Sequence, residues 1–235
     1  MERSLKLPDR LMAIAGFIKT GASVVDVGTD HGLLPVYLAQ NDIARHIIAS
    51  DISAGSLEAA RRSANKYGVA DKITFVVAAG LDGVHKTDVD TVVVAGLGGE
   101  TIAGILAKAG WTREQAVNIV LQPQTKVGEL CAWLREGGYT IHDAALSLDG
   151  GKYYVIICIA GGKSDSILEP EIELLARLMH KRDPLFPEYL DDLIARTGRA
   201  LKSMESAKPP EILNMALRLS VYTGLKEANE KWQEQ

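Results

Sequence analysis

The chain has 235 residues, of which 47% are hydrophobic and 24% are charged, enough for one α/β domain with a sizeable core and a smaller additional part. Its formal net charge of −4 argues against binding nucleic acid through bulk charge alone, although a local basic face stays possible. No apolar stretch approaches the roughly 18 residues that a membrane span needs, and the N-terminus lacks the apolar region of a signal peptide, so we expect a cytoplasmic protein without a membrane partner.

Strand and helix patterns alternate over most of the chain. Residues 5–19 place apolar side chains at helical spacing, with Pro8 and Asp9 near the start, and predict a leading helix. The elements predicted after it are strand 23–27, helix 33–40, strand 46–50, helix 53–67, strands 73–77 and 90–95, helix 100–109, strand 117–121, helix 125–136, and strands 139–147 and 153–160. This alternation favours an α/β fold with a mostly parallel sheet, helices on both faces and an antiparallel hairpin at one edge.

The pattern changes at the Gly- and Ser-rich stretch 161–166, after which strand patterns are absent. Three helical segments follow, separated by proline-containing breaks, at about 169–182, 188–206 and 211–231. A short proline turn between two amphipathic helices predicts an antiparallel helical hairpin. We therefore expect two domains, residues 1–163 and 164–235.

Residues 24–35 predict a ligand-binding turn, because an apolar strand ends at Gly28 and a helical pattern follows. In a doubly wound sheet such a turn faces the crevice where small molecules bind. Gly28 and Gly32 lack the third glycine of a dinucleotide site, and Asp26 and Asp30 accompany them. An acidic loop holds phosphate poorly but suits S-adenosylmethionine, which carries an ammonium and a sulfonium. The alternative is an ordinary turn in which Asp30 caps the helix.

Further contacts are expected where the next strands end. Asp51 closes the second apolar run, where a carboxylate can accept both hydroxyls of a ribose. The glycine-rich stretch 78–83 follows the third strand, and 95–99 holds three glycines in four residues, which we attribute to close approach of the backbone to a ligand. The cofactor-binding candidates are Asp26, Gly28, Thr29, Asp30, His31, Gly32, Asp51, Ile52, Ala79, Gly80, Leu81, Ala95 and Gly96.

Other side chains admit two interpretations each. Gln122 and Gln124 follow the strand at 117–121, and their amides either pair with a base or satisfy nearby backbone. Tyr153 and Tyr154 point to opposite faces of the edge hairpin, so that one packs in the core and the other offers a stacking surface. His31 either orders the glycine loop or acts as a base.

The two cysteines, Cys131 and Cys158, lie inside apolar patterns and match no metal-ligand spacing. We therefore expect reduced core thiols and no metal site. The sequence contains no Gly-x-Ser-x-Gly motif, so nucleophilic hydrolysis has no support.

Taken together, these motifs resemble the TrmK family of bacterial tRNA adenine-N1 methyltransferases, which modify adenine 22. The resemblance covers nearly the whole chain and is carried by Arg10 and Leu11, D-V-G-T-D-H-G-L-L-P at 26–35, A-S-D-I at 49–52, A-G-L-G-G at 95–99, L-Q-P-Q at 121–124, G-K-Y-Y at 151–154 and the helical tail. It implies a class I methyltransferase Rossmann-like fold, S-adenosylmethionine as cofactor, tRNA as partner and a C-terminal coiled-coil-like domain that helps hold tRNA. Ala79 departs from the carboxylate or amide common in the family, Leu97 replaces a Met and Gln124 an Asn.

If the substrate is adenine N1, Asp30, Gln122 and Tyr154 are the catalytic candidates. N1 carries a lone pair at neutral pH, so positioning supplies most of the catalysis. Asp30, or the carbonyls of Ala95 and Gly96, would stabilise the cationic product, and Tyr154 would stack on a base taken out of its helix. Two other functions stay open: methylation of a small molecule or protein, and a non-catalytic cofactor-binding module.

The tail of residues 164–235 holds ten Lys and Arg against thirteen Asp and Glu, so any contact with nucleic acid must come from one face. The basic candidates are Arg177, Lys181, Arg182, Arg196, Arg199 and Lys202. The last three recur at three-residue spacing and share one side of a helix. The alternative is a solvated face of a helical hairpin. Oligomeric state is not predicted.

Overall fold

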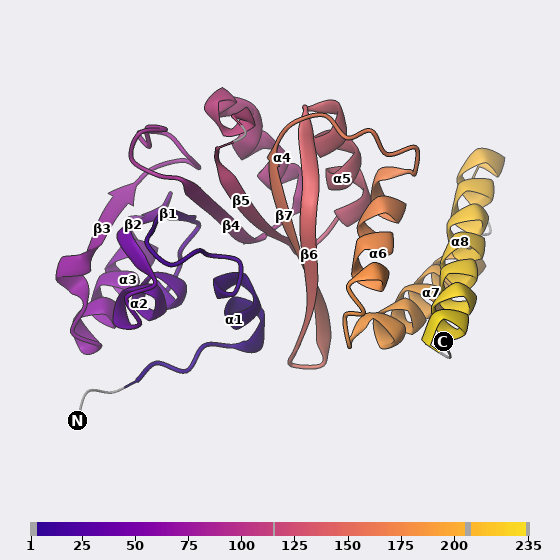
Figure 1. Ribbon diagram of the computed structural model, residues 1–235, viewed down its shortest axis with the longest axis horizontal. Coiled ribbons are helices and arrows are strands. Elements are labelled where there is room, and N and C mark those ends of the chain that lie inside the picture. The colour runs from indigo at the N-terminus through magenta and orange to yellow at the C-terminus, as the bar shows by residue number, and fades with distance from the viewer. Residues whose placement is uncertain (1–3, 115, 205–207, 234–235) are drawn as a thin grey trace. The chain divides into compact units, whose positions relative to one another are not determined.

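The computed structural model describes residues 4–114, 116–204 and 208–233. Within these ranges no helix is both long and apolar enough to cross a membrane. Figure 1 shows strands and helices alternating from the N-terminus to β7, followed by helices alone.

Seven strands of the described residues form one sheet in the order β3-β2-β1-β4-β5-β7-β6 (Figure 1). They are β1 (Ala22–Val27), β2 (Ala44–Asp51), β3 (Ile73–Val77), β4 (Thr91–Leu97), β5 (Asn118–Pro123), β6 (Tyr139–Asp149) and β7 (Lys152–Gly161). The pairs among β1 to β5 are parallel, whereas β7 runs antiparallel to both β5 and β6. The predicted parallel sheet with an antiparallel edge hairpin is confirmed.

Helices cover both faces of this sheet, as the sequence predicted. They are α1 (Asp9–Ala15), α2 (Leu33–Gln40), α3 (Ala54–Lys66), η1 (Ala70–Lys72), α4 (Gly99–Lys108), η2 (Gly110–Arg113) and α5 (Val127–Glu136). Val24 and Val93 pack in one core cluster with Ile14 of α1 and Leu34 of α2. Because side chains alternate along a strand, Val25 and its neighbours point to the other face, over which α4 and α5 lie.

The leading helix is shorter than the pattern over residues 5–19 suggested. Pro8 fixes its start, because proline has no N–H to continue a helix upstream, and the helix ends at Ala15, with Gly16 as its C-cap. Leu5 and Leu7 are nevertheless buried, so their spacing reports packing of an extended segment. At the edge hairpin, Gly150 and Gly151 both have positive φ and form the tight turn between β6 and β7.

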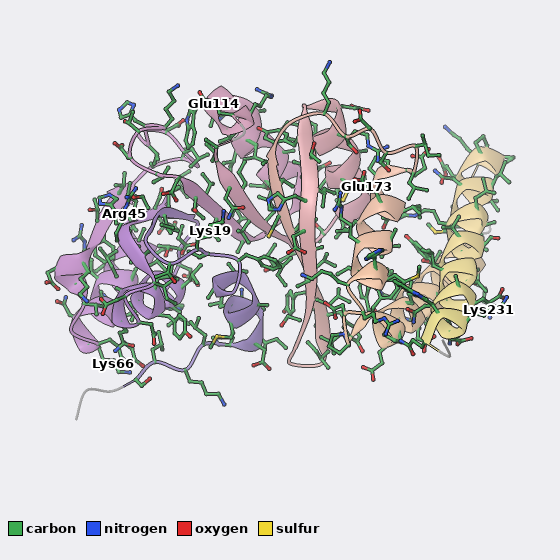
Figure 2. The ribbon with its side chains drawn as sticks, viewed as in Figure 1. Lys19, Arg45, Lys66, Glu114, Glu173 and Lys231 are labelled. Atoms are coloured by element: carbon green, nitrogen blue, oxygen red, sulfur yellow. The ribbon has the colours of Figure 1, made fainter. Side chains whose placement is uncertain are left out.

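The chain divides into two compact units, residues 1–177 and 178–235, whereas composition placed the boundary after residue 163. The reason lies in α6 (Pro170–His180), whose buried Glu173 pairs with Arg135 of α5 at 2.7 Å and with Arg177 at 3.3 Å. Figure 2 labels Glu173 on this helix. The first turns of α6 therefore belong to the α/β unit.

The second unit contains α7 (Phe186–Lys202) and α8 (Pro209–Gln233). Lys226 near the end of α8 pairs with Asp191 near the start of α7, so the two helices form the expected antiparallel hairpin. Leu190 of α7 and Tyr222 of α8 are buried. Leu213, Leu217 and Val221 form an exposed apolar row on α8 that the sequence pattern did not single out.

Two of the basic tail candidates interact with other residues of their own compact unit. Arg177 donates to Glu173 and to the carbonyl of His142, and the guanidinium of Arg182 lies 5.4 Å from the ring centre of Trp232. Arg177 is therefore not part of an open basic face. Arg196, Arg199 and Lys202 are exposed on α7, and Arg196 pairs with Asp192 at 2.8 Å.

Candidate active site

Two adjoining pockets lie where the carboxyl ends of β1, β2 and β4 meet. The first, which we call the apolar pocket, has a volume of about 630 Å³, and the second, the acidic pocket, about 370 Å³. Gly28, Asp51 and Leu97 line both of them. A single elongated ligand could therefore occupy both pockets, with its middle at Asp51.

The glycine loop after β1 is held against β2 by backbone hydrogen bonds. The N–H groups of Gly28 and Thr29 both donate to the carbonyl of Ser50, at 2.8 and 3.1 Å. Gly28, Asp30 and Gly32 all have positive φ, a conformation that favours glycine and tolerates Asp. The loop therefore bends back between β1 and α2 and exposes its backbone to the acidic pocket.

Asp26 is buried at the base of this loop, and the hydroxyl of Thr29 donates to its carboxylate at 2.7 Å. The pKa of the Asp26 carboxyl is raised to about 6, chiefly by burial; the Thr29 hydrogen bond and the more distant Arg10 lower this pKa, and the nearby Asp51 adds to the rise. A buried carboxylate of this kind lacks a full counter-charge, and it would gain one from a cationic ligand.

Asp51 joins the loop to the end of β2. One of its carboxylate oxygens accepts from the N–H of Ser53 at 2.8 Å, and the other accepts from the N–H of Asp30 at 3.3 Å. Asp30 and His31 lie on the outer side of the acidic pocket, with 3.7 Å between the His31 Nε2 and an Asp30 oxygen. Both side chains are mostly exposed, so they are free to meet a ligand that enters from solvent.

The apolar pocket is lined mainly by aliphatic and aromatic side chains, namely Val27, Ile52, Leu81, Leu97, Ile105 and Trp111. Ile52 is 75% exposed, which is unusual for an isoleucine beside a buried strand and indicates a surface that a flat ligand can cover. The loop 78–83 forms another wall, with Ala79, Gly80 and Leu81 all lining the pocket.

We expected a ligand to approach the backbone of all three glycines in the β4–α4 loop, but only one of them borders a pocket. Gly96 has a φ of +75° and is an extra residue between two paired positions of β4, where its backbone borders the acidic pocket. A Cβ on Gly99, by contrast, would lie 2.7 Å from the carbonyl oxygen of Lys126, and one on Gly98 would lie 3.2 Å from the Thr125 hydroxyl. Close approach of a neighbouring loop, and not of a ligand, accounts for these two glycines.

The amide of Gln122 is fully buried and engaged within the protein. Its oxygen accepts from the N–H of Gly96 at 3.2 Å, and its nitrogen donates to the carbonyl of Pro123 at 2.9 Å. These bonds favour the second of the two interpretations, in which Gln122 holds the Gly96 loop in place. Gln124 is exposed and lines the acidic pocket, so it is the amide that can face a ligand.

A basic and aromatic rim stands beside the acidic pocket. Arg10 of α1 lines the pocket, and its guanidinium lies 6.0 Å from the ring centre of Tyr154 and 3.8 Å from the Asp149 carboxylate. The ammonium of Lys152 lies 5.2 Å from the same ring. Tyr153 and Tyr154 are both half-buried, so neither is the core residue that alternation suggested.

Most of the candidates from the sequence converge on these pockets. Asp26, Thr29, Asp30, His31, Ala95 and Gly96 line the acidic pocket, Ile52, Ala79, Gly80 and Leu81 line the apolar one, and Gly28 and Asp51 line both. Gly32, Gln122 and Tyr154 do not line either. Gly32 packs on α3 instead, where a Cβ would lie 2.7 Å from that of Ala60.

Several lining residues were not among the site residues that the sequence predicted. Arg10 and Leu97 had appeared only as parts of motifs, and Gln124 as an amide with two open interpretations, while Asp82, Thr101, Lys108 and Trp111 had no signal of their own. The last three lie on α4 and η2, whose apolar spacing is typical of any packed helix. The position of Asp82 inside a glycine-rich loop was the one clue that could have drawn attention to it.

Comparison with known proteins adds an independent observation. The methyltransferase domain family matches residues 7–157. A tRNA (adenine(22)-N(1))-methyltransferase of Bacillus subtilis is 32% identical over 162 residues, which cover 69% of this chain and 68% of the relative.

Two solved structures match almost the full chain. Streptococcus pneumoniae Sp1610 in complex with S-adenosyl-L-methionine has a TM-score of 0.81 at 25% identity, covering 94% of this chain and 100% of that chain. M. capricolum TrmK in complex with S-adenosyl-homocysteine has a TM-score of 0.77 at 26% identity, covering 96% and 99%. Both likenesses extend beyond the α/β unit into the helical tail.

Proposed function

Since the chain belongs to the TrmK family of methyltransferases, we propose that its two adjoining pockets hold one S-adenosylmethionine and present it to an adenine of tRNA. The protein transfers the methyl group of this cofactor to N1 of adenine 22 in tRNA. The observation that carries the site assignment is the junction at Asp51, where an apolar and an acidic pocket meet.

The residues present fit this cofactor. The apolar pocket suits an adenine ring, and Asp51 at the junction suits the ribose hydroxyls, because a carboxylate accepts hydrogen bonds and cannot donate them. In the acidic pocket, Asp26 offers a buried negative charge to an ammonium, and Arg10 offers a guanidinium to a carboxylate. The cofactor's amino-acid end carries both of those charges.

The cofactor supplies a methyl group on a positively charged sulfur, which makes that carbon electrophilic. Adenine N1 has an unprotonated lone pair at neutral pH, so no residue has to remove a proton from it first. The protein's contribution is to fix the geometry of attack and to exclude wrong orientations. Such positioning lowers the activation barrier by up to about 7–11 kcal/mol. The Gly28 and Gly96 backbones and Gln124 surround this position.

The methylated base carries a positive charge that the site must tolerate. Asp30 borders the acidic pocket with an exposed carboxylate, and we assign it the stabilisation of this charge together with the carbonyls of Ala95 and Gly96. Gln122 acts through Gly96, as a positioning residue, by holding that loop against β5. The site needs no metal ion for any of these tasks.

N1 lies on the Watson–Crick edge of adenine, so a paired or stacked target must be displaced before it can react. Tyr154 stands beside Arg10 at the edge of the acidic pocket, and we assign it the stacking of the displaced base. Lys152, close to the same ring, offers a charge to the adjoining phosphate. For the helical tail, the exposed Arg196, Arg199 and Lys202 support a role in holding the rest of the tRNA.

The defining experiment uses S-adenosylmethionine labelled in its methyl group and tRNA transcripts, followed by digestion to nucleosides. We expect label in 1-methyladenosine, and none with a transcript in which adenine 22 is replaced by guanine, since guanine N1 carries a hydrogen. Label in another nucleoside, or in the control transcript, would contradict the assignment. Absence of label from every nucleoside would favour the two alternatives, a small-molecule or protein substrate and a non-catalytic cofactor-binding module.

A further inference from the structure

The apolar pocket is bordered by two carboxylates within the described part of the chain, Asp51 and Asp82. Each carboxylate oxygen of Asp51 accepts a backbone hydrogen bond, one from the N–H of Ser53 and the other from the N–H of Asp30. The Asp82 side chain is exposed and makes no hydrogen bond or ion pair with the residues that the structure describes. Asp82 is therefore an acceptor at the pocket wall that the described residues leave without a partner.

The backbone of the loop brings Asp82 back toward the start of the same loop. The N–H of Asp82 donates to the carbonyl of Ala79 at 3.2 Å, and Gly80 between them has a φ of +64°, which defines a tight turn. The first and fourth residues of such a turn have Cα atoms within about 7 Å of each other. Asp82 thus stands close to Ala79, whose own side chain is only a methyl group.

Among the described lining residues, the other side chains with polar atoms are Thr101, Lys108 and Trp111, and the indole N–H of Trp111 can only donate. The ammonium of Lys108 can only donate, so it cannot receive a hydrogen from an amino group. The Thr101 hydroxyl lies near Gly98, at the entrance to α4. Of the described carboxylates that line the pocket, Asp82 is the one whose oxygens accept no hydrogen bond from the described residues.

We propose that Asp82 accepts a hydrogen bond from the 6-amino group of the cofactor's adenine and so determines the preference for an amino-purine. This inference depends on the proposed function, which places the adenine in the apolar pocket. A carboxylate accepts only, and a purine without the amino group has no hydrogen to donate to Asp82, whose exposed side chain then stays hydrated. Ala79 forms part of the pocket wall without a polar group, and Asp82, three residues later in the same turn, supplies the polar contact.

The test measures binding of the full chain by calorimetry, with S-adenosylhomocysteine and with its analogue in which hydrogen replaces the 6-amino group. The wild-type protein should prefer S-adenosylhomocysteine by about ten-fold or more, as expected for a hydrogen bond to a charged group. In Asp82→Ala this preference should fall to about one, with the affinity for the analogue unchanged. The unchanged affinity also serves as a check that the pocket is intact.

Two further variants sharpen the result. Asp71→Ala removes an exposed carboxylate on η1, outside both pockets, and should keep the wild-type preference. Adding Ala79→Asn to Asp82→Ala should restore part of the preference, because an amide oxygen then stands across the turn. A wild-type protein without preference, or an Asp82→Ala variant that retains it, would overturn the role of Asp82 alone. A wild-type protein that binds neither compound would overturn the proposed function as well.

Discussion

At the scale of single residues, Asp26 has opposite effects on folding and on binding. Its carboxylate is buried among β-strands, where the charged form loses hydration, and the resulting pKa of about 6 is higher than the usual 3.8. Between these two pH values the folded chain binds more protons than the unfolded chain. The free energy of unfolding therefore falls as pH rises from 3.8 to about 6, and this loss of stability stays constant at higher pH.

Asp26→Asn should remove this deficit while keeping an oxygen for the Thr29 hydroxyl. We expect the free energy of unfolding at pH 7 to rise by roughly 2–3 kcal/mol, because the pKa of Asp26 is about 6 in the folded chain against 3.8 in the unfolded one. Below about pH 4 the free energy of unfolding of the variant should match that of the wild type. Urea denaturation at several pH values measures it. S-adenosylhomocysteine should bind more weakly to the variant, because its ammonium loses a buried counter-charge.

Asp30→Asn provides the control for this prediction. It removes a carboxylate from the same loop, but one whose side chain is 69% exposed, so no desolvation is relieved. A similar pH-dependent gain in both variants would show that the general acidity of the loop, and not the burial of Asp26, sets the stability of the protein.

At the scale of elements, the glycines of the site have different physical reasons to be glycine. Gly28 and Gly96 need a positive φ at the pocket. Gly32 needs both a positive φ and space, because the N-terminus of α2 packs directly on α3 at Ala60. The packing of α2 on α3 therefore sets the position of the glycine loop.

Gly32→Ala should destabilise the protein more than Gly68→Ala does. Both positions have positive φ, at +66° and +70°, and share a strain of about 1–2 kcal/mol, but only the first would place a Cβ 2.7 Å from that of Ala60. The overlap should add roughly 1–3 kcal/mol. Thermal and urea unfolding of the two variants measure the difference. Equal losses of stability in the two variants would mean that α3 can move away from the added Cβ without an energetic penalty. Contact with α3 would then not position the loop.

At the scale of the whole molecule, the two compact units have separate tasks in the proposed function. The α/β unit contains both pockets, whereas the tail offers the exposed Arg196, Arg199 and Lys202 on α7. Residues 164–235 have a negative net charge and the second unit by itself has no net positive charge, so binding of tRNA through it depends on the arrangement of these three charges along one helix face.

Replacing Arg196, Arg199 and Lys202 together by Glu should weaken tRNA binding and flatten its salt dependence. For each phosphate that the variant no longer neutralises, the slope of log K against log salt should fall by about 0.7–0.9. Binding of S-adenosylhomocysteine should not change. Filter binding over a range of salt concentrations measures both affinity and slope.

The same charge change placed on α3, with Arg61, Arg62 and Lys66 replaced by Glu, is the matched control, since these side chains are exposed on the other compact unit. Equal weakening by both triple variants would attribute the effect to net charge. Unchanged binding in the α7 variant would assign tRNA recognition to the α/β unit and its leading helix.

Local periodicity was sufficient to place nearly every strand and helix, because a period of two or of 3.6 residues is a property of consecutive side chains. It was also sufficient to bring Asp26, Gly28 and Asp51 together. The carboxyl ends of neighbouring parallel strands meet at one edge of a sheet, so the order of elements already implies their proximity.

The tertiary structure alone decided which atoms these residues contact. Arg10 reaches the acidic pocket because α1 folds back over the edge hairpin, and Gln122 turns inward because the bulge at Gly96 leaves an N–H for it. Gly99 is glycine because of a carbonyl that lies far from it in sequence, on Lys126. Such contacts depend on how separate loops converge, and no short-range pattern in the sequence records that convergence.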